Sequence, residues 1–374
     1  MANWSETVGA VAVISAQSGS PALLALVQTA STVPAVAVAL PGGAAADLVD
    51  RRRLLVVLVA AMCASMLLLA AAVATGRASP AVVLVLTFAM GCAIAVAVPA
   101  FASLIPELGP RDELAAAVTL NGISINLARA LGPALAGVIL ALTGGTALFA
   151  LLGAALAAMT ILLLATPRVR TSSAGEGLGE AMRAGVRFAR SSAELQAVLA
   201  RGFAFVVPAS ALWAVLPAVA VHRLGLEPAA FGGILAALGT GAVLGAQLLP
   251  WLRARLGLDR LVTLGSAYGA ANLALLSVVE STPLAVASLV PAGAAWLAVL
   301  SSLNTSAQLA APAWVRGRAL SINQLVFAAG MAGGSAAWGV VAETAGLQAA
   351  LLAAGAALVV SLLAGRRWSL GGLT

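Results

Sequence analysis

Residues 54–74 read LLVVLVAAMCASMLLLAAAVA, a stretch without a single charged side chain. A transmembrane α-helix needs about 20 predominantly apolar residues to cross the hydrocarbon core of a bilayer, and this stretch has that length. It is apolar on every face, whereas a strand of a membrane β-barrel alternates apolar and polar residues over roughly ten positions. The stretch therefore predicts a transmembrane helix and excludes a barrel strand.

The whole chain shares the composition of this stretch. Of its 374 residues, 62% are hydrophobic and only 9% are charged, and the mean hydropathy is +1.06. A soluble globular domain carries roughly 25% charged residues, so a soluble enzyme is excluded and an all-α membrane protein is predicted. Cuts at charge clusters and at Gly, Pro and Ser turns leave eleven apolar segments of spanning length: 21–46, 54–74, 80–105, 114–142, 146–166, 201–221, 231–250, 260–279, 283–306, 319–343 and 347–365.

A shorter apolar segment, Trp4 to Ala16, precedes these eleven and is followed by a Ser-Gly-Ser-Pro turn at Ser18 to Pro21. Its residues reach only about 20 Å at 1.5 Å per residue, whereas the hydrocarbon core is roughly 30 Å thick. We expect a first helix about half as long as a membrane span. Two complete six-helix repeats would need a further half-helix at the N-terminus.

No basic residue occurs in the first 50 positions, so no cleaved signal peptide is expected.

Arginine supplies every basic side chain, since the 20 basic residues include no lysine, and the net charge is +7. In a soluble protein such a charge would indicate nucleic acid, but these arginines lie between apolar runs, so no nucleic-acid partner is expected. If the segments alternate across the bilayer, 17 of the 20 fall on one side, Arg77 and Arg223 on the other, and Arg129 within a segment. The positive-inside rule then assigns loops 47–53 and 167–200 and the C-terminus to the cytoplasmic side of the inner membrane.

The longest polar stretch, residues 167–200, is predicted to be a cytoplasmic linker. It divides the chain into an N-terminal helical bundle over 1–166 and a C-terminal helical bundle over 201–374. Charged residues recur within it at helical spacing and predict an amphipathic helix on the membrane surface: Glu180, Arg183, Arg187, Arg190 and Glu194.

The two bundles share a sequence pattern at a fixed offset. Three positions around the loop 47–53 recur 202 residues later: Gly43, Arg51 and Arg53 correspond to Gly245, Arg253 and Arg255. The offset indicates a duplication. Parallel repeats related by an axis along the membrane normal are one plan of secondary transporters, with the substrate held at the midplane between them.

The first motif is the loop Gly43-Ala-Ala-Ala-Asp47-Leu-Val-Asp50-Arg51-Arg52-Arg53. It resembles the loop signature of the major facilitator superfamily, Gly-x-x-x-Asp-Arg-x-Gly-Arg-Arg. Four residues match, namely Gly43, Asp47, Arg51 and Arg52, whereas Leu48 and Asp50 replace an arginine and a glycine. A carboxylate here can cap a helix and pair with arginine, in a cluster that opens and closes as the halves rock. The alternative is a positive-inside anchor with one cap.

The second motif lies in segment 114–142 and reads Gly132-Pro133-Ala-Leu-Ala136-Gly137. It resembles the Gly-Pro-x-x-Gly-Gly element of the antiporter branch of the same superfamily, with Ala136 in place of one glycine. Proline bends a helix and small residues let two helices approach closely. The resemblance therefore implies a hinge or a seal between the two halves.

A third stretch, residues 303–320, completes a resemblance that covers the chain from Trp4 to Arg367. Together with residues 18–21, 105–108 and 121–133, it is similar to the transmembrane secretion effectors, a branch that includes the enterobactin exporter and macrolide-efflux relatives. The resemblance implies two pseudo-symmetric six-helix bundles that rock around a central cavity, with the first helix truncated. It adds Asn304, in the third stretch, to the candidate residues for substrate or proton coupling.

Ionisable groups within membrane spans are costly and are functional candidates by default. Glu6 lies in the short first helix and Arg129 lies in segment 114–142. The resemblance places the first and fifth helices side by side, so we expect a Glu6–Arg129 charge pair that protonation of Glu6 or an anionic substrate would break. In the alternative, Arg129 is a structural clamp that bonds to Asn121, Asn126 and backbone carbonyls.

Trp213 and Trp296 lie mid-span in two helices that the resemblance places around the cavity. They are expected to form one wall of an aromatic substrate pocket, although core packing is the commoner use of a buried indole.

Cys63 and Cys92 fall inside apolar segments, where a thiol behaves as a small hydrophobe, so no metal site is expected. The glycines of residues 239–245 lack the P-loop lysine and a preceding strand, which predicts helix packing rather than an ATP site.

These features together predict a secondary active transporter rather than an enzyme. We expect proton-coupled efflux of a small amphipathic compound, such as a drug, a siderophore or a secondary metabolite, by a monomer in the lipid bilayer that needs no cofactor. Two alternatives stay open, a lysophospholipid flippase and a truncated, non-transporting membrane scaffold.

Overall fold

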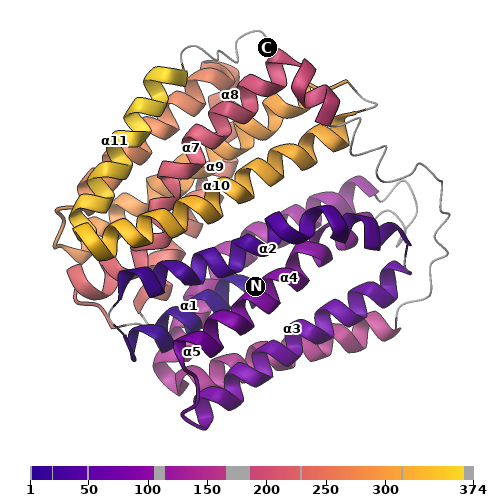
Figure 1. Ribbon diagram of the computed structural model, residues 1–374, viewed down its shortest axis with the longest axis vertical. Helices are drawn as coiled ribbons and strands as arrows, with labels where there is room; N and C mark the ends of the chain where they lie inside the picture. The colour runs from indigo at the N-terminus through magenta and orange to yellow at the C-terminus, as the bar shows by residue number, and fades with distance from the viewer. Residues whose placement is uncertain are drawn as a thin grey trace. The chain divides into compact units, whose positions relative to one another are not determined.

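The computed structural model describes residues 2–18, 20–48, 50–104, 114–165, 186–227, 230–312 and 315–365, and its regular elements there are helices (Figure 1). In chain order these helices are α1 (Ala2–Ser15), α2 (Pro21–Leu48), α3 (Arg51–Ala74), α4 (Pro80–Leu104), α5 (Leu114–Ala165), α7 (Ala193–Ala218), the π-helical turn η2 (Val219–Arg223), α8 (Phe231–Leu276), α9 (Thr282–Leu309), α10 (Arg316–Ala345) and α11 (Leu347–Gly365).

Two of these helices, α5 and α8, are too long for one span, since the 52 residues of α5 would measure about 78 Å at 1.5 Å per residue. Each breaks at a glycine with positive φ, Gly144 (φ 80°) in α5 and Gly257 (φ 74°) in α8, a backbone conformation that glycine adopts without a steric penalty. The breaks separate the predicted segments 114–142 and 146–166, and 231–250 and 260–279. Within the described ranges, 8 helices are long and apolar enough to cross a membrane, which agrees with the predicted all-α membrane protein.

The first helix is short, as the sequence predicts: α1 has 14 residues, about 21 Å. Helix α7 begins at Ala193, before the start of the predicted apolar segment 201–221. Ser192 caps it, with its Oγ accepting a hydrogen bond from the backbone N–H of Leu195 at 3.2 Å. Residues 166–185 lie outside the described residues, so most of the predicted amphipathic linker helix is untested.

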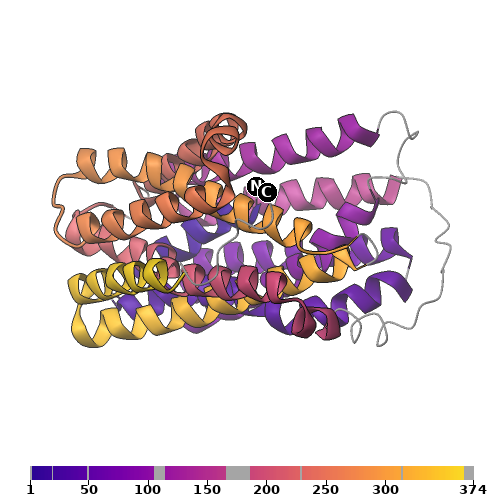
Figure 2. The ribbon, with the colours of Figure 1, turned by 90° about the horizontal axis from the view of Figure 1, so that it is seen from above.

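The helices form two compact units, each described by itself. In the first unit (Met1–Gly19, Ala30–Gly175 and Leu226–Ala236), α1 and α3 pack along α5, and α4 packs on α3. In the second unit (Ser20–Thr29, Glu176–Gly225 and Ala237–Thr374), α7 contacts α9, α10 and α11. Within each unit the helices lie lengthwise beside one another (Figures 1 and 2).

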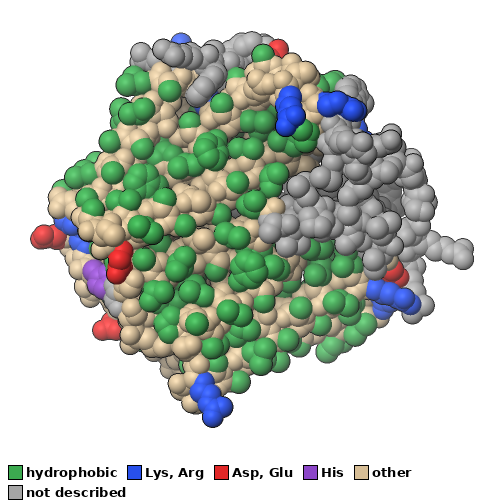
Figure 3. All heavy atoms as spheres, in the orientation of Figure 1, with side chains coloured by type: hydrophobic (Ala, Val, Ile, Leu, Met, Phe, Trp, Pro, Cys, Tyr) green, Lys and Arg blue, Asp and Glu red, His purple; other side chains and the backbone are tan. Residues whose placement is uncertain are grey.

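Apolar side chains cover the sides of the helices, and charged side chains lie near helix ends on the face seen in Figure 3. Leu142 is 79% exposed, Ile161 67% and Val85 65%. In a bilayer such side chains meet lipid tails that are as apolar as they are, so apolar burial alone does not drive the helices together. Close packing has to hold the helices to one another.

Glycines provide this close packing where α8 crosses α9. A Cβ added at Gly241 would overlap the carbonyl oxygen of Val290, and one added at Gly293 would overlap the carbonyl oxygen of Leu238. At Gly245 an added Cβ would lie 2.8 Å from the Cα of Ala294. Gly241 and Gly245 thus pack α8 against α9, as predicted from the sequence.

We expect Gly241→Ala to destabilise the protein by about 1–3 kcal/mol, because the new methyl group forces α8 and α9 apart. The measurement is thermal unfolding of the purified protein in detergent. Gly233→Ala on the same helix is the matched control, since no atom lies within 4 Å of its added Cβ. An equal loss of stability in both variants would contradict this account of the crossing.

Candidate functional site

Three residues near the start of α1 fix this short helix inside the first unit. Glu6 is 1% exposed, and its carboxylate accepts a hydrogen bond from the Thr87 hydroxyl of α4 at 2.5 Å. The Ser5 hydroxyl donates to the carbonyl oxygen of Gly132 in α5 at 3.0 Å. A Cβ at Gly9 would lie 2.7 Å from the Phe149 ring. The Glu6 side chain of α1 therefore faces α4 in a closely packed interior.

The predicted partner of Glu6 lies on the neighbouring helix. Arg129 precedes Gly132 by three residues on α5, and Gly132 is bound by Ser5, the neighbour of Glu6. The side chains of Arg129, Asn121 and Asn126 lie outside the described residues, so the charge pair stays a prediction. Thr87 is a partner that sequence reasoning missed, because a lone threonine in an apolar segment gives no signal of its contacts.

The Gly132-Pro133-Gly137 motif forms a packing surface in the first unit. A Cβ at Gly232, near the start of α8, would lie 2.5 Å from the carbonyl oxygen of Pro133 and 2.7 Å from the Cα of Gly137. The helices meet backbone to backbone there.

The loop motif contributes a helix cap and a carbonyl clamp. The side chain of Asp50, which replaces the glycine of the superfamily signature, accepts hydrogen bonds from the backbone N–H groups of Arg52 and Arg53 at 3.0 and 3.2 Å and so caps α3. The Arg52 guanidinium donates to the carbonyl oxygens of Leu163, at 2.8 Å, and of Leu164, near the end of α5. The side chains of Asp47 and Arg51 lie outside the described residues, and Gly43 lies in α2.

The two tryptophans singled out from the sequence come together in the second unit. The ring centroids of Trp213 and Trp296 are 5.4 Å apart, with an interplanar angle of 66°. Phe205 lies 5.6 Å and Phe327 6.2 Å from Trp296. These four residues are the aromatic cluster, which joins α7, α9 and α10. Sequence reasoning missed the two phenylalanines, since their positions in the segments resemble those of any core residue.

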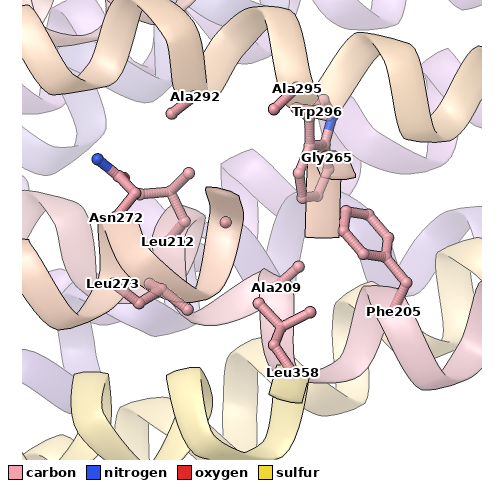
Figure 4. Close-up of a pocket in the computed structure, with 11 residues that line it drawn as sticks. Phe205, Ala209, Leu212, Gly265, Asn272, Leu273, Ala292, Ala295, Trp296 and Leu358 are labelled. Atoms are coloured by element: carbon pink, nitrogen blue, oxygen red, sulfur yellow. The ribbon is translucent and has the colours of Figure 1, made fainter. Parts of the chain in front are cut away.

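A small apolar pocket lies beside this cluster, between α7, α8, α9 and α11. In Figure 4 the rings of Phe205 and Trp296 lie on one side of the pocket and Asn272 on the other. Asn272 is 2% exposed, and its Nδ2 donates to the Oγ and the carbonyl oxygen of Ser288 at 2.9 and 3.3 Å. Its Oδ1 has no hydrogen-bond partner among the described residues.

Other polar contacts join helices of the second unit. The Nδ2 of Asn323 donates to the Oδ1 of the predicted site residue Asn304 at 2.9 Å, linking α10 to α9. Arg201, which is 7% exposed, forms an ion pair with Asp259 and donates to the Thr263 hydroxyl at 3.2 Å. Among the described residues, no group of His, Cys, Asp and Glu side chains could hold a metal ion.

The family model for transmembrane secretion effectors, which is part of the major facilitator superfamily, matches residues 1–373. The chain belongs to this family. It is therefore a multi-pass membrane transporter of the major facilitator type, with an all-helical fold over the described residues. The comparison with curated proteins found no match.

Solved transporters share the fold of this family member. The nucleoside transporter NupG is 13% identical, with a TM-score of 0.75, and the match covers 98% of this chain and 95% of NupG. A bacterial homologue of the human lysosomal transporter Spinster, in an inward-facing and unoccupied conformation, is 16% identical, with a TM-score of 0.77 and coverage of 98% and 95%. The peptide transporter POT, in a mutant form, is 16% identical, with a TM-score of 0.75 and coverage of 100% and 93%. These likenesses concern the fold alone.

Arg52→Lys tests whether the hydrogen bonds from Arg52 to the Leu163 and Leu164 carbonyl oxygens stabilise the protein, or whether only its positive charge matters. Lysine keeps the charge but has no planar fork of donors for two carbonyl oxygens, so we expect a loss of about 1 kcal/mol, measured by thermal unfolding in detergent. Arg53→Lys is the matched control, because the Arg53 side chain is 65% exposed and reaches Asp50 only at 4.0 Å. Equal stability of Arg52→Lys and wild type would favour the anchor.

Proposed function

We propose that this transporter exports a small amphipathic compound, such as a drug, a siderophore or a secondary metabolite, in exchange for protons. The family to which the chain belongs is named for secretion, which supports export over import. The aromatic cluster and its apolar surroundings suit a partly apolar compound. Alternating access, with the two bundles rocking about a central cavity, is the mechanism that such repeats support.

The single observation that carries the proton-coupling part is the position of Glu6. It is the one acidic side chain that is buried among the described residues. An ionised carboxylate is expensive to bury away from water unless it is paired or hydrogen-bonded, and such a group within a membrane span is a candidate proton carrier. We assign to Glu6 the role of binding and releasing the proton that drives transport. Arg129 on α5 is then the countercharge when Glu6 is ionised.

The two motifs that resemble superfamily signatures would then serve as gates. The backbone contact of Gly232 with Pro133 and Gly137 seals one end of the path in one state and opens in the other. The hydrogen bonds from Arg52 to the carbonyl oxygens near the end of α5 join the start of α3, in the loop motif, to α5. Loops 47–53 and 167–200 and the C-terminus lie in the cytoplasm, and the transporter works as a monomer in the inner membrane.

We expect Glu6→Gln to abolish transport driven by a pH gradient, because glutamine keeps the hydrogen-bonding shape but cannot exchange a proton. The assay measures uptake of fluorescent amphipathic dyes into inside-out vesicles or proteoliposomes. Counterflow without a pH gradient should continue in Glu6→Gln, since the substrate path is intact. Wild-type dependence on the pH gradient in this variant would refute proton coupling through Glu6.

Glu280→Gln is the matched control, since Glu280 is exposed in the connection between α8 and α9, and it should behave as wild type. The same vesicles distinguish the alternatives. If the protein moves a fluorescent lysophospholipid independently of the pH gradient and does not transport the dyes, the result would favour the flippase. A protein that binds and moves no compound of a broad panel would favour the non-transporting scaffold.

A further inference from the structure

We infer that the pocket beside the aromatic cluster is a subsite for the hydroxyl or amine substituent of an aromatic compound, with Asn272 Oδ1 as the acceptor for that group. The inference rests on the proposed function, because it names the chemistry of the compound that the transporter would carry. It stands on the pocket, the unpaired oxygen and the continuity of the pocket with the aromatic cluster.

The unpaired oxygen of Asn272 is the first reason. A buried amide carbonyl without a donor costs roughly 1–3 kcal/mol, and buried polar groups in folded proteins nearly always have a partner. The Nδ2 of Asn272 is already fixed by Ser288, which also fixes the direction of Oδ1. A ligand O–H or N–H that enters the pocket would satisfy this oxygen.

The composition of the pocket lining is the second reason. Apart from Asn272, the pocket is lined by apolar or small residues, and its walls include Gly265, Ala292 and Ala295. No ionisable side chain lines it. A charged group would therefore lose its hydration without gaining a countercharge, whereas a neutral hydroxyl or amine would gain one directed hydrogen bond. The subsite selects a neutral donor on an apolar body.

The aromatic wall is the third reason. Trp296 lines the pocket and is also the centre of the aromatic cluster, within 5.4 Å of Trp213 and 5.6 Å of Phe205 between ring centroids. Aromatic rings prefer edge-to-face or offset contacts at such distances. A compound whose ring packs against Trp296 and Phe205 could extend its polar substituent across the pocket to Asn272 (Figure 4).

The test compares β-naphthol with its methyl ether, which has the same rings but no hydrogen-bond donor. Binding is measured on the full chain in lipid nanodiscs by equilibrium dialysis. The wild type should bind β-naphthol about tenfold more tightly than the ether, equivalent to about 1.4 kcal/mol. Asn272→Leu should remove this preference while the ether binds as before. Tyr268→Phe is the control, because Tyr268 donates to the Ser288 carbonyl oxygen but does not line the pocket, and it should keep the preference.

A second variant guards against misfolding of Asn272→Leu. Ala209→Leu adds bulk to the pocket from α7, and it should weaken binding of both compounds; thermal unfolding of each variant shows that it is folded. Equal binding of the two compounds by the wild type, or a wild-type preference in Asn272→Leu, would overturn the inference. Dialysis needs no transport, so the expected preference in a protein that moves no dye would leave the subsite standing while the proposed export fails.

Discussion

Close approach of helix backbones at small residues is the contact on which the rest of this molecule depends. Lipid tails are as apolar as leucine, so the hydrophobic effect does not bring helices together within a bilayer. Each helix satisfies its own backbone hydrogen bonds, and glycine then lets two helices touch. Gly241 and Gly293 do this for α8 and α9, and Gly232 does it for α8 and α5. Trp296 follows Gly293 by three residues on α9, so that crossing also positions its ring.

The duplication seen as a 202-residue offset in the sequence is expressed in these same contacts. Gly132, Gly137 and Gly144 of α5 correspond to Gly334, Gly339 and Gly346, and both Gly144 and Gly346 have positive φ. The carbonyl oxygen of Gly132 accepts a hydrogen bond from the Ser5 hydroxyl of α1. Gly334 lies against the backbone of α7, and a Cβ added at Gly334 would be 2.6 Å from the Val207 carbonyl oxygen. The two halves thus place glycine at these corresponding positions, while Pro133 in one half corresponds to Ser335 in the other.

The sequence predicts the features that depend on neighbours along the chain. Apolar runs gave the spans and the short α1, and glycines marked the breaks within α5 and α8. Mid-span position was enough to select Trp213 and Trp296. Contacts between distant segments could not be predicted, because periodicity does not say which helix faces meet. Thr87 beside Glu6 and the Ser288–Asn272 pair are such contacts, and the Asp50 cap was hidden because Asp47 and Asp50 are equally placed in the loop motif.

Two buried charged side chains among the described residues have opposite surroundings. Arg201 pairs with the carboxylate of Asp259, whose side chain is 42% exposed, so the buried guanidinium has a permanent countercharge at the surface. Glu6 accepts a hydrogen bond from the neutral hydroxyl of Thr87. A hydroxyl can donate to a carboxylate and can equally accept from a carboxylic acid, so Thr87 can bond to either protonation state of Glu6. The environment of Arg201 therefore suits a permanent structural charge, whereas that of Glu6 accommodates both protonation states.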